Sequence, residues 1–329
     1  MTPPASSILD TVHRARLNLA SGIRRTPCLP LAAMGPRGTE VWLKREDLQR
    51  TGSFKERGAR NALLCLDGEA RRRGVVAASA GNHALGLAYH GAQLGIPVQV
   101  VMPRGAPRVK VERCRGLGAR VLQVGDSFAE AEVHAAFLAR AHGFALVHPF
   151  DNLAVMAGQG TLAIEALEQA GGAEVLVLPV GGGGLLAGAA AASLDRHPGL
   201  TVIAAEPEGA ASFQASFRRG EPEAVSVAPT VADGLAVRCV ARRAFDLARP
   251  HVARSVTVTE EEIMAAMGVL ARQCGIVAEG AGATAFAAVL FGKCPPGRVI
   301  VPITGRNIDP AVHARALAVG GRAWERRAA

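Results

Sequence analysis

The sequence predicts an α/β fold in which open, mostly parallel sheets are flanked by helices. From about residue 74, short runs rich in β-branched residues alternate with alanine-rich stretches, the pattern of parallel strands joined by crossover helices. The chain has 329 residues, 49% of them apolar, so it can bury a sizeable core. Three expected strands, 75–79, 174–180 and 298–304, end in small-residue turns that lead into helices: SAGNHALG, GGGGLLAG and TGRNID. Open α/β sheets bind ligands at such carboxyl edges.

Six strands are expected, each a short apolar run bounded by turn-forming residues. In chain order they are 75–79 (VVAAS), 98–103 (VQVVMP), 120–125 (RVLQVG), 174–180 (EVLVLPV), 200–206 (LTVIAAE) and 298–304 (RVIVPIT). Helices are expected between them. The segments 208–230 and 293–297 are rich in Gly, Pro or Ser and are predicted to be loops.

The stretch LQRTGSFKERGARNAL, residues 48–63, places Lys55 at an expected helix start. Ser53 followed three residues later by Glu56 has the spacing of a capping box. Lys55 then lies in the first turn, beside unpaired N–H groups and the positive end of the helix dipole, where an ammonium is disfavoured. That field and any burial lower the pKa of the amine, as suits a lysine that forms an imine. The other lysines, at 44, 110 and 293, have no such setting.

Gly181–Gly184 join an expected strand directly to an expected helix. Four glycines leave backbone N–H groups free to converge on an anion at the helix N-terminus, so this turn is a candidate phosphate cradle. A tight turn without a ligand is one alternative. Another is a dinucleotide site, because Gly182, Gly184 and Ala187 fit the relaxed G-x-G-x-x-A pattern and Glu206 ends the next strand. That alternative predicts a nucleotide-binding oxidoreductase.

A poised lysine combined with a phosphate cradle on a different segment indicates pyridoxal phosphate, whose aldehyde needs an amine and whose phosphate needs N–H donors. Six segments together resemble the threonine/serine dehydratases of the tryptophan-synthase-like (fold type II) pyridoxal-phosphate family. They are, in order, KREDLQRTGSFKERGA, SAGNHALGLA, HPFDNLAVMAGQGT, PVGGGGLLAG, PTVADGLAV and VTVTEEEI. The resemblance covers nearly the whole chain.

The resemblance implies two sheets in two domains. The large cofactor-binding domain would comprise 1–48 and 149–329, and the small domain would comprise 49–148. A C-terminal regulatory domain is not expected. Relatives are often dimers or tetramers, so a homodimer or homotetramer is implied.

The resemblance also implies a role for each residue of the site. Lys55 would bind the cofactor covalently and later move the substrate Cα proton, and Asn82 would bind the cofactor's phenolic oxygen. Thr304 would offer its hydroxyl to the pyridine nitrogen. The residues implied to contact the cofactor are Phe54, Lys55, Asn82, Gly181, Gly182, Gly183, Gly184, Leu185, Gly234 and Thr304. The residues implied to face the substrate are Ser79, Ala80, Gly81, Asn82, His83 and Arg306.

The implied reaction removes water and ammonia from a small β-hydroxy amino acid such as L-threonine or L-serine, leaving a 2-oxo acid. A hydroxyl at the pyridine nitrogen makes a weaker electron sink than a carboxylate would, which favours loss of the β-hydroxyl over reprotonation. Arg306 stands where most relatives have glycine. It either points into solvent or receives a second substrate carboxylate, so a 3-hydroxyaspartate-like compound or an intermediate of hydroxyectoine breakdown is an alternative substrate.

Two further positions depart from the related serine racemases. Their branch has a serine, the acid on the face opposite the lysine, where this chain has Ala80. Their divalent-cation site uses a glutamate, a carbonyl and an aspartate, where this chain has Glu206, Ala210 and Ser212. Without the aspartate, no metal site is predicted.

Bulk composition argues against other classes of function. The net charge is +9, but the basic residues are spread along the chain, and with one Tyr and no RNA-binding signature a nucleic-acid partner is not expected. No stretch resembles a leader or a membrane span, so a cytoplasmic protein without a membrane partner is expected. The six cysteines are scattered and predicted to be reduced thiols.

Overall fold

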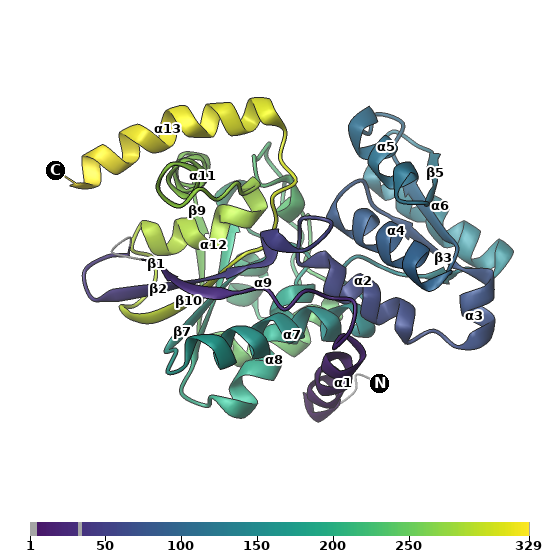
Figure 1. The fold of residues 1–329 in the computed structure, drawn as a ribbon, viewed down its shortest axis with the longest axis horizontal. Helices are drawn as coiled ribbons and strands as arrows, with labels where there is room; N and C mark the ends of the chain where they lie inside the picture. Colours follow the sequence, from purple (N-terminus) through teal and green to yellow (C-terminus); the bar gives the residue numbers. More distant parts are fainter. Residues whose placement is uncertain (1–4, 32–34, 329) are drawn as a thin grey trace.

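Two sheets covered by helices make up the computed structural model, which describes residues 5–31 and 35–328 (Figure 1). One sheet has six strands in the order β1 (Cys28–Leu31), β2 (Thr39–Arg45), β10 (Gly297–Ile303), β7 (Val175–Pro179), β8 (Thr201–Pro207) and β9 (Arg254–Val258). The other has four, in the order β5 (Arg120–Gln123), β4 (Val98–Met102), β3 (Val75–Ala78) and β6 (Ala145–Leu146). Among these strands β1 pairs antiparallel with β2, and the other pairings are parallel. The predicted fold class is confirmed.

The helices connect and cover the strands. They are α1 (Ala5–Asn18), α2 (Lys55–Leu64), α3 (Gly68–Arg73), α4 (Asn82–Leu94), α5 (Arg108–Gly116), α6 (Phe128–His142), α7 (Leu153–Ala170), α8 (Gly184–Arg196), α9 (Ser212–Arg219), α10 (Arg242–Ala248), α11 (Glu260–Cys274), α12 (Gly280–Leu290) and α13 (Pro310–Ala328). Short 3-10 turns are η1 (Glu46–Leu48), η2 (Glu208–Ala210), η3 (Asp233–Leu235) and η4 (Arg249–His251).

Both faces of the six-stranded sheet are buried, because alternate residues of each strand point to opposite sides. In β7, Leu176 and Leu178 join a core with α1, α7, α8 and α10. Val175 and Val177 join a second core with α11 and α12. Figure 1 shows these two helical layers on either side of the strands. A strand buried on both faces reads as a continuous apolar run, which is why β7 could be predicted.

The four-stranded sheet is built in the same way. Val75 and Ala77 of β3 pack with α2, α4 and α5, whereas Val76 and Ala78 pack with α6. This sheet and its helices lie to one side of the six-stranded sheet, at the right of Figure 1. The carboxyl ends of β3, β7 and β10 lead into the three turns that the sequence singles out as ligand sites.

All six predicted strands are present, with ends shifted by no more than two residues. Strands β1, β2, β6 and β9 were not predicted. β2 carries Lys44, whose side chain is fully buried and bonds to Glu165, 121 residues away. A lysine in a short apolar run argues against a buried strand unless its partner is known, and here the partner lies far away in the chain.

The segment 208–230 is not entirely a loop as predicted, because α9 occupies Ser212–Arg219. This helix has no side-chain cap from its own N-terminus. Instead the carboxylate of Glu206, at the end of β8, accepts the N–H groups of Phe213 and Gln214, each at 2.7 Å. A cap supplied from a neighbouring strand leaves no local capping pattern in the sequence. The segment 293–297 carries no helix or strand before Gly297, the first residue of β10.

Candidate active site

Lys55 is the first residue of α2, as predicted. Its Nζ donates a hydrogen bond to the carbonyl oxygen of Pro149 at 2.9 Å and lies 5.4 Å from the centre of the Phe54 ring. Burial lowers the pKa of the amine to about 8, and the negative charge of Glu279 opposes that shift. The uncharged form, which an attack on an aldehyde requires, is therefore far more populated near neutral pH than in an exposed lysine.

The predicted capping box at this helix is wrong. Phe54 holds the N-cap position without a side-chain hydrogen bond, and the buried hydroxyl of Ser53 has no partner among the described residues. The Glu56 carboxylate instead accepts the N–H of Thr51 and lies 3.2 Å from His90. Ser53 is drawn away from the helix because it forms a β-bridge with Gly305, just beyond β10. A contact between segments some 250 positions apart takes precedence over the local capping pattern.

The glycine turn 181–184 leads from β7 into α8, as predicted. Within the described chain, the N–H groups of Gly181, Gly182 and Gly183 donate no hydrogen bond. Gly183 has φ +88°, which favours glycine. A Cβ at Gly182 would clash with the ring of Phe150, and one at Gly184 would lie 3.0 Å from Phe150 Cα. The turn thus leaves free N–H donors at the positive end of a helix, an arrangement that suits an anion such as phosphate.

A second line of contacts joins the glycine turn to β10. A Cβ at Gly181 would lie 3.3 Å from the carbonyl oxygen of Gly234, and one at Gly234 would lie 3.2 Å from Ala281. The Thr304 hydroxyl, which is buried, lies 3.4 Å from the carbonyl oxygen of Ala281. The Thr304 carbonyl in turn accepts the N–H of Phe54 at 3.0 Å.

These contacts close into a ring. On one side the Lys55 amine bonds to the Pro149 carbonyl, and the next residue, Phe150, packs against Gly182 and Gly184 of the glycine turn. On the other side the turn connects through Gly234 and Thr304 back to the residue before Lys55. We call these contacts the site ring. Leu185, which follows the turn, is buried in the core beneath it.

The N-terminus of α4 carries most of the predicted substrate residues. The Ser79 hydroxyl accepts the N–H groups of Gly81 and Ala84, at 3.2 and 3.3 Å. The N–H groups of Asn82 and His83 donate no hydrogen bond within the described chain. They are available to a carboxylate at the end of this 13-residue helix. Ala80 is partly buried and packs on the core of the small sheet.

The His83 ring is almost fully buried, 2% exposed. Its Nε2 lies 3.0 Å from the carbonyl oxygen of Val147, and its Nδ1 has no partner in the described residues. Burial and the nearby charge of Lys55 lower its pKa to about 3, so the ring is neutral. With the proton on Nε2 donated to Val147, the free Nδ1 is an acceptor, which does not bind a carboxylate. Any role of His83 toward the substrate therefore falls to its backbone N–H.

Asn82 is held by two residues that the sequence did not single out, Glu279 and Asn307. Its amide donates to Glu279 at 2.6 Å and accepts from Asn307 at 2.6 Å. Burial and the charge of Asp233 raise the pKa of Glu279 to about 7, while the hydrogen bonds from Asn82 and Asn307 lower it. Glu279 is the N-cap residue of α12 and follows no expected strand, so nothing in the sequence indicated it as a site residue. Asn307 lies in the TGRNID turn after an expected strand, so its position could have indicated a role in the site.

Phe150 and Pro149 were also missed as site residues, although both lie in the HPFDN segment that carries the resemblance. Arg306 is exposed, and its N–H donates to the carbonyl oxygen of Gly52 at 2.9 Å. Its guanidinium makes no hydrogen bond or ion pair with the described residues and lies against Gly52.

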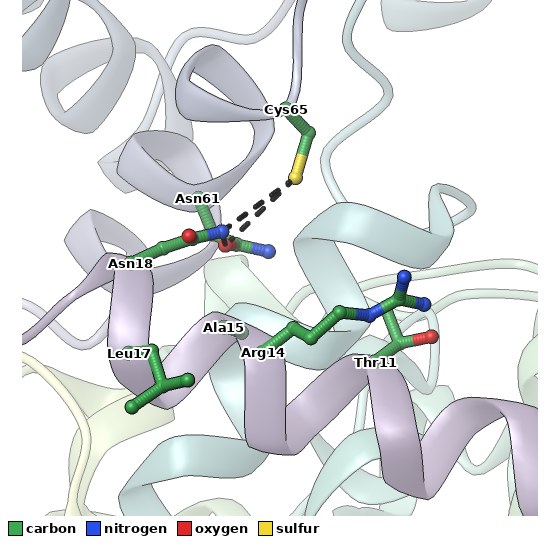
Figure 2. A pocket seen from close by; sticks show the side chains of 7 residues that line it. All are labelled: Thr11, Arg14, Ala15, Leu17, Asn18, Asn61 and Cys65. Carbon is green, nitrogen blue, oxygen red and sulfur yellow. Dashed lines mark hydrogen bonds between the residues drawn. The ribbon is translucent and has the colours of Figure 1, made fainter.

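A pocket of about 320 Å³ lies elsewhere, between α1 and α2 (Figure 2). At its wall Asn18 donates to Asn61 at 3.0 Å, and the Cys65 thiol lies beside both amides. None of the predicted cofactor or substrate residues lines this pocket. It is separate from the site ring.

The residues fit pyridoxal phosphate, because one site combines a buried amine of lowered pKa with a cradle of free N–H groups. Comparison with known proteins agrees: residues 19–305 match the family of pyridoxal-phosphate dependent enzymes. The chain belongs to this family. Its cofactor is pyridoxal phosphate.

Among curated proteins, the L-threonine ammonia-lyase of Thermotoga maritima is 44% identical over 303 residues, covering 92% of this chain and 76% of that protein. The catabolic L-threonine dehydratase of Staphylococcus aureus is 37% identical over 308 residues, covering 92% of this chain and 89% of that protein. The chain is thus similar along most of its length to enzymes with these names.

Solved structures of this fold type include similar chains. The processed form of threonine deaminase isoform 2 from Solanum lycopersicum has a TM-score of 0.91 at 32% identity, covering 97% of this chain and 88% of that chain. Serine racemase from Dictyostelium discoideum has a TM-score of 0.86 at 36% identity, covering 92% of this chain and 98% of that chain. The fold type II architecture implied by the sequence is confirmed.

The alternative of a nucleotide-binding oxidoreductase is wrong. The family match contradicts it, and Glu206, the candidate ribose ligand, is fully buried with both oxygens bonded to the N-terminus of α9. Ser212 is buried beside it. In the described part of the chain, no three or more His, Cys, Asp or Glu side chains form a group that could hold a metal. No helix there is both long and apolar enough to cross a membrane.

Proposed function

We propose that this protein is a pyridoxal-phosphate-dependent dehydratase, or ammonia-lyase, of a small β-hydroxy amino acid such as L-threonine or L-serine. The products would be a 2-oxo acid and ammonia. The observation that carries the proposal is the hydrogen bond from Lys55 to Pro149. The next residue, Phe150, packs on the glycine turn, so this bond brings the reactive amine and the proposed phosphate cradle into one site. Two relatives at 44% and 37% identity, named for threonine ammonia-lyase and dehydratase, support it.

Lys55 would attach the cofactor and then act as the base. When bound, pyridoxal phosphate withdraws electrons from the substrate Cα, so that its proton can leave and the β-hydroxyl can be expelled. With a pKa of about 8, the Lys55 amine can accept that proton near neutral pH and return it. Its hydrogen bond to the Pro149 carbonyl fixes the direction of the amine before the cofactor binds.

The other residues would bind and orient. The N–H groups of Gly181–Gly183 would hold the phosphate, and the Thr304 hydroxyl would meet the pyridine nitrogen. The substrate carboxylate would bind at the N-terminus of α4, on the N–H groups of Asn82 and His83. The arrangement of two helix N-termini supports this division, because each offers free donors to one anionic group.

The same proposal includes the domain organisation. A large domain of 1–48 and 149–329 and a small domain of 49–148 are supported by the separate six-stranded and four-stranded sheets. The protein would act in the cytoplasm as a homodimer or homotetramer, with an amino acid as its small-molecule partner.

The experiment is a substrate panel on the purified holoenzyme. L-threonine, L-serine and 3-hydroxyaspartate are each incubated with enzyme, and ammonia and 2-oxo acid are measured together. Equal amounts of both products from threonine or serine support the proposal. A yellow enzyme that releases neither product from any member would contradict it.

Arg306→Gly tests the alternative substrate in the same panel. If the free guanidinium of Arg306 receives a second carboxylate, 3-hydroxyaspartate is the better substrate of the wild type and the variant loses that preference. If Arg306 only points into solvent, the variant keeps the wild-type ranking of substrates.

A further inference from the structure

Glu279 is a buried carboxylate, 8% exposed, whose two oxygens are both used as acceptors. Its Oε1 accepts a hydrogen bond from Asn82 Nδ2 at 2.6 Å. Its Oε2 accepts the backbone N–H of Asn307 at 3.1 Å. The close fit extends to Gly305, since a Cβ there would clash with the carboxylate. This carboxylate therefore joins the N-terminus of α4 to the turn after β10.

Both polar atoms of the Asn307 side-chain amide are hydrogen-bonded. Its Nδ2 donates to Asn82 Oδ1 at 2.6 Å and to the carbonyl oxygen of Thr51 at 2.9 Å. Its Oδ1 accepts a hydrogen bond from Arg113 Nη1 at 3.0 Å. An amide bonded on three sides in this way cannot exchange its oxygen and nitrogen without breaking all three bonds.

The bonds leave Asn82 with one unused amide hydrogen. Of its two Nδ2 hydrogens, one goes to Glu279 and the other has no partner among the described residues. Rotation of the amide by half a turn would place Oδ1 against the carboxylate of Glu279 and Nδ2 against the Nδ2 of Asn307. The contact between the two Nδ2 groups would be repulsive in either protonation state of Glu279, because an NH₂ group only donates. The contact with Glu279 would also be repulsive whenever its carboxylate is ionised, because that form only accepts.

We propose that Glu279 and Asn307 are positioning residues that force Asn82 to present an N–H, and not a carbonyl oxygen, to the bound cofactor. This rests on the role proposed for Asn82, which binds the phenolic oxygen of pyridoxal phosphate. A donated N–H stabilises the oxygen as an anion, whereas a carbonyl oxygen in its place would repel it. The charge on that oxygen sets the visible absorption of the bound cofactor.

The substitution Glu279→Gln tests the pair. Glutamine has one acceptor for two incoming N–H groups, so either Asn82 or the backbone of Asn307 loses its bond and Asn82 is free to rotate. Glu206→Gln is the matched control, because Glu206 is also a buried carboxylate that accepts two N–H groups but contacts no residue of the site ring.

The readouts are the absorption spectrum of the bound cofactor and its dissociation constant, both measured without an amino acid. We expect Glu279→Gln to shift the spectrum in the same direction as Asn82→Ala and to weaken cofactor binding roughly tenfold, as for loss of one charge-assisted bond. The double variant should be no worse than Asn82→Ala alone. Glu206→Gln should keep the wild-type spectrum and affinity.

A wild-type spectrum and affinity in Glu279→Gln, with both changed in Asn82→Ala, would overturn the inference. If Glu279→Gln does not fold, Asn307→Ala carries the same test, because it removes the donor to Asn82 Oδ1 without touching the carboxylate. An unchanged spectrum in that variant also overturns the inference. Because no substrate is present, a failure of the proposed dehydration does not alter these readouts, and the two failures are distinguishable.

Discussion

The Lys55 amine and the Pro149 carbonyl oxygen are joined by a hydrogen bond of 2.9 Å across 94 positions of the chain. A carbonyl oxygen accepts from an ammonium or from a neutral amine, so this bond holds the side chain in place in either protonation state. Because the bond forms in both states, burial is what mainly determines whether the Lys55 amine is charged. The Pro149 carbonyl thus fixes the position of the Lys55 amine.

We predict that Lys55→Ala lowers turnover by roughly 10³-fold or more, because the variant loses the group proposed to move the proton. Reduction of the wild-type holoenzyme with borohydride followed by mass spectrometry should find the pyridoxyl group on Lys55. Lys110→Ala is the control and should still be labelled, since Lys110 is exposed and paired with Asp233. A label on another lysine would refute the assignment.

The pKa of Lys55 predicts how fast the apoenzyme takes up pyridoxal phosphate. The neutral amine is the attacking form, and burial lowers its pKa to about 8. The rate should therefore rise as the pH rises through about 8 and level off above it, well below the range of an exposed lysine. Stopped-flow absorbance against pH measures this profile. A rate that is still rising steeply above pH 10 would be inconsistent with the buried amine.

Gly183→Val should weaken cofactor binding by at least about tenfold and destabilise the protein. A valine at φ +88° costs roughly 1–3 kcal/mol. Its Cβ would also lie 2.8 Å from Val240 and 2.9 Å from Ala244. The damage therefore comes from displacement of the turn and not from direct obstruction of the phosphate. Equilibrium titration with pyridoxal phosphate measures it.

Gly105→Val is the matched control, since a Cβ there meets nothing within 4 Å. It should bind the cofactor as the wild type does. Equal losses in both variants would contradict a specific role for the glycine turn.

Elimination should greatly exceed racemisation in the wild type, because Ala80 has no group that can supply a proton. The site can accommodate a hydroxyl there, as Ala80 is only partly buried. Ala80→Ser should raise the racemised fraction several-fold, on the order expected for a modest acid. Chiral chromatography of unreacted serine beside a 2-oxo acid assay checks this. Comparable racemisation and elimination in the wild type would mean that another acid lies on that face.

Arg57→Met should destabilise the fold by about 3–5 kcal/mol, because it leaves buried carboxylates without their partner. Arg57 is fully buried and forms hydrogen bonds at 2.7 to 2.9 Å with Glu46 and Glu165. Urea unfolding gives the change. Arg219→Met, in an exposed ion pair, should leave the midpoint almost unchanged. A loss below about 1 kcal/mol in Arg57→Met would show that the buried network adapts.

The sequence predicted correctly those parts of the molecule that are determined by neighbouring residues in the chain. Runs such as VLVLP form strands because both of their faces are buried, and Gly183 was recognisable because its turn needs glycine. The position of Lys55 at a helix start was also correct, although the capping box proposed as its cause was not.

The parts that were missed depend on partners far away in the chain. Lys44 gave no signal, yet it is fully buried, with its amine bonded to Thr26 and Glu165. Glu279 is recognisable as part of the site only from its hydrogen bond with Asn82, 197 positions away. A single sequence shows neither pairing.

The place of β10 determines when the site can exist during synthesis. It is the strand between β2 and β7, so residues 39–45 and 175–179 have no common neighbour until residues 297–303 have emerged from the ribosome. Thr304 and the partner of Ser53 follow immediately. A nascent chain without them exposes two apolar strand edges and cannot close the site ring. The site ring, and with it the proposed cofactor site, can therefore close only after residue 305 has been made.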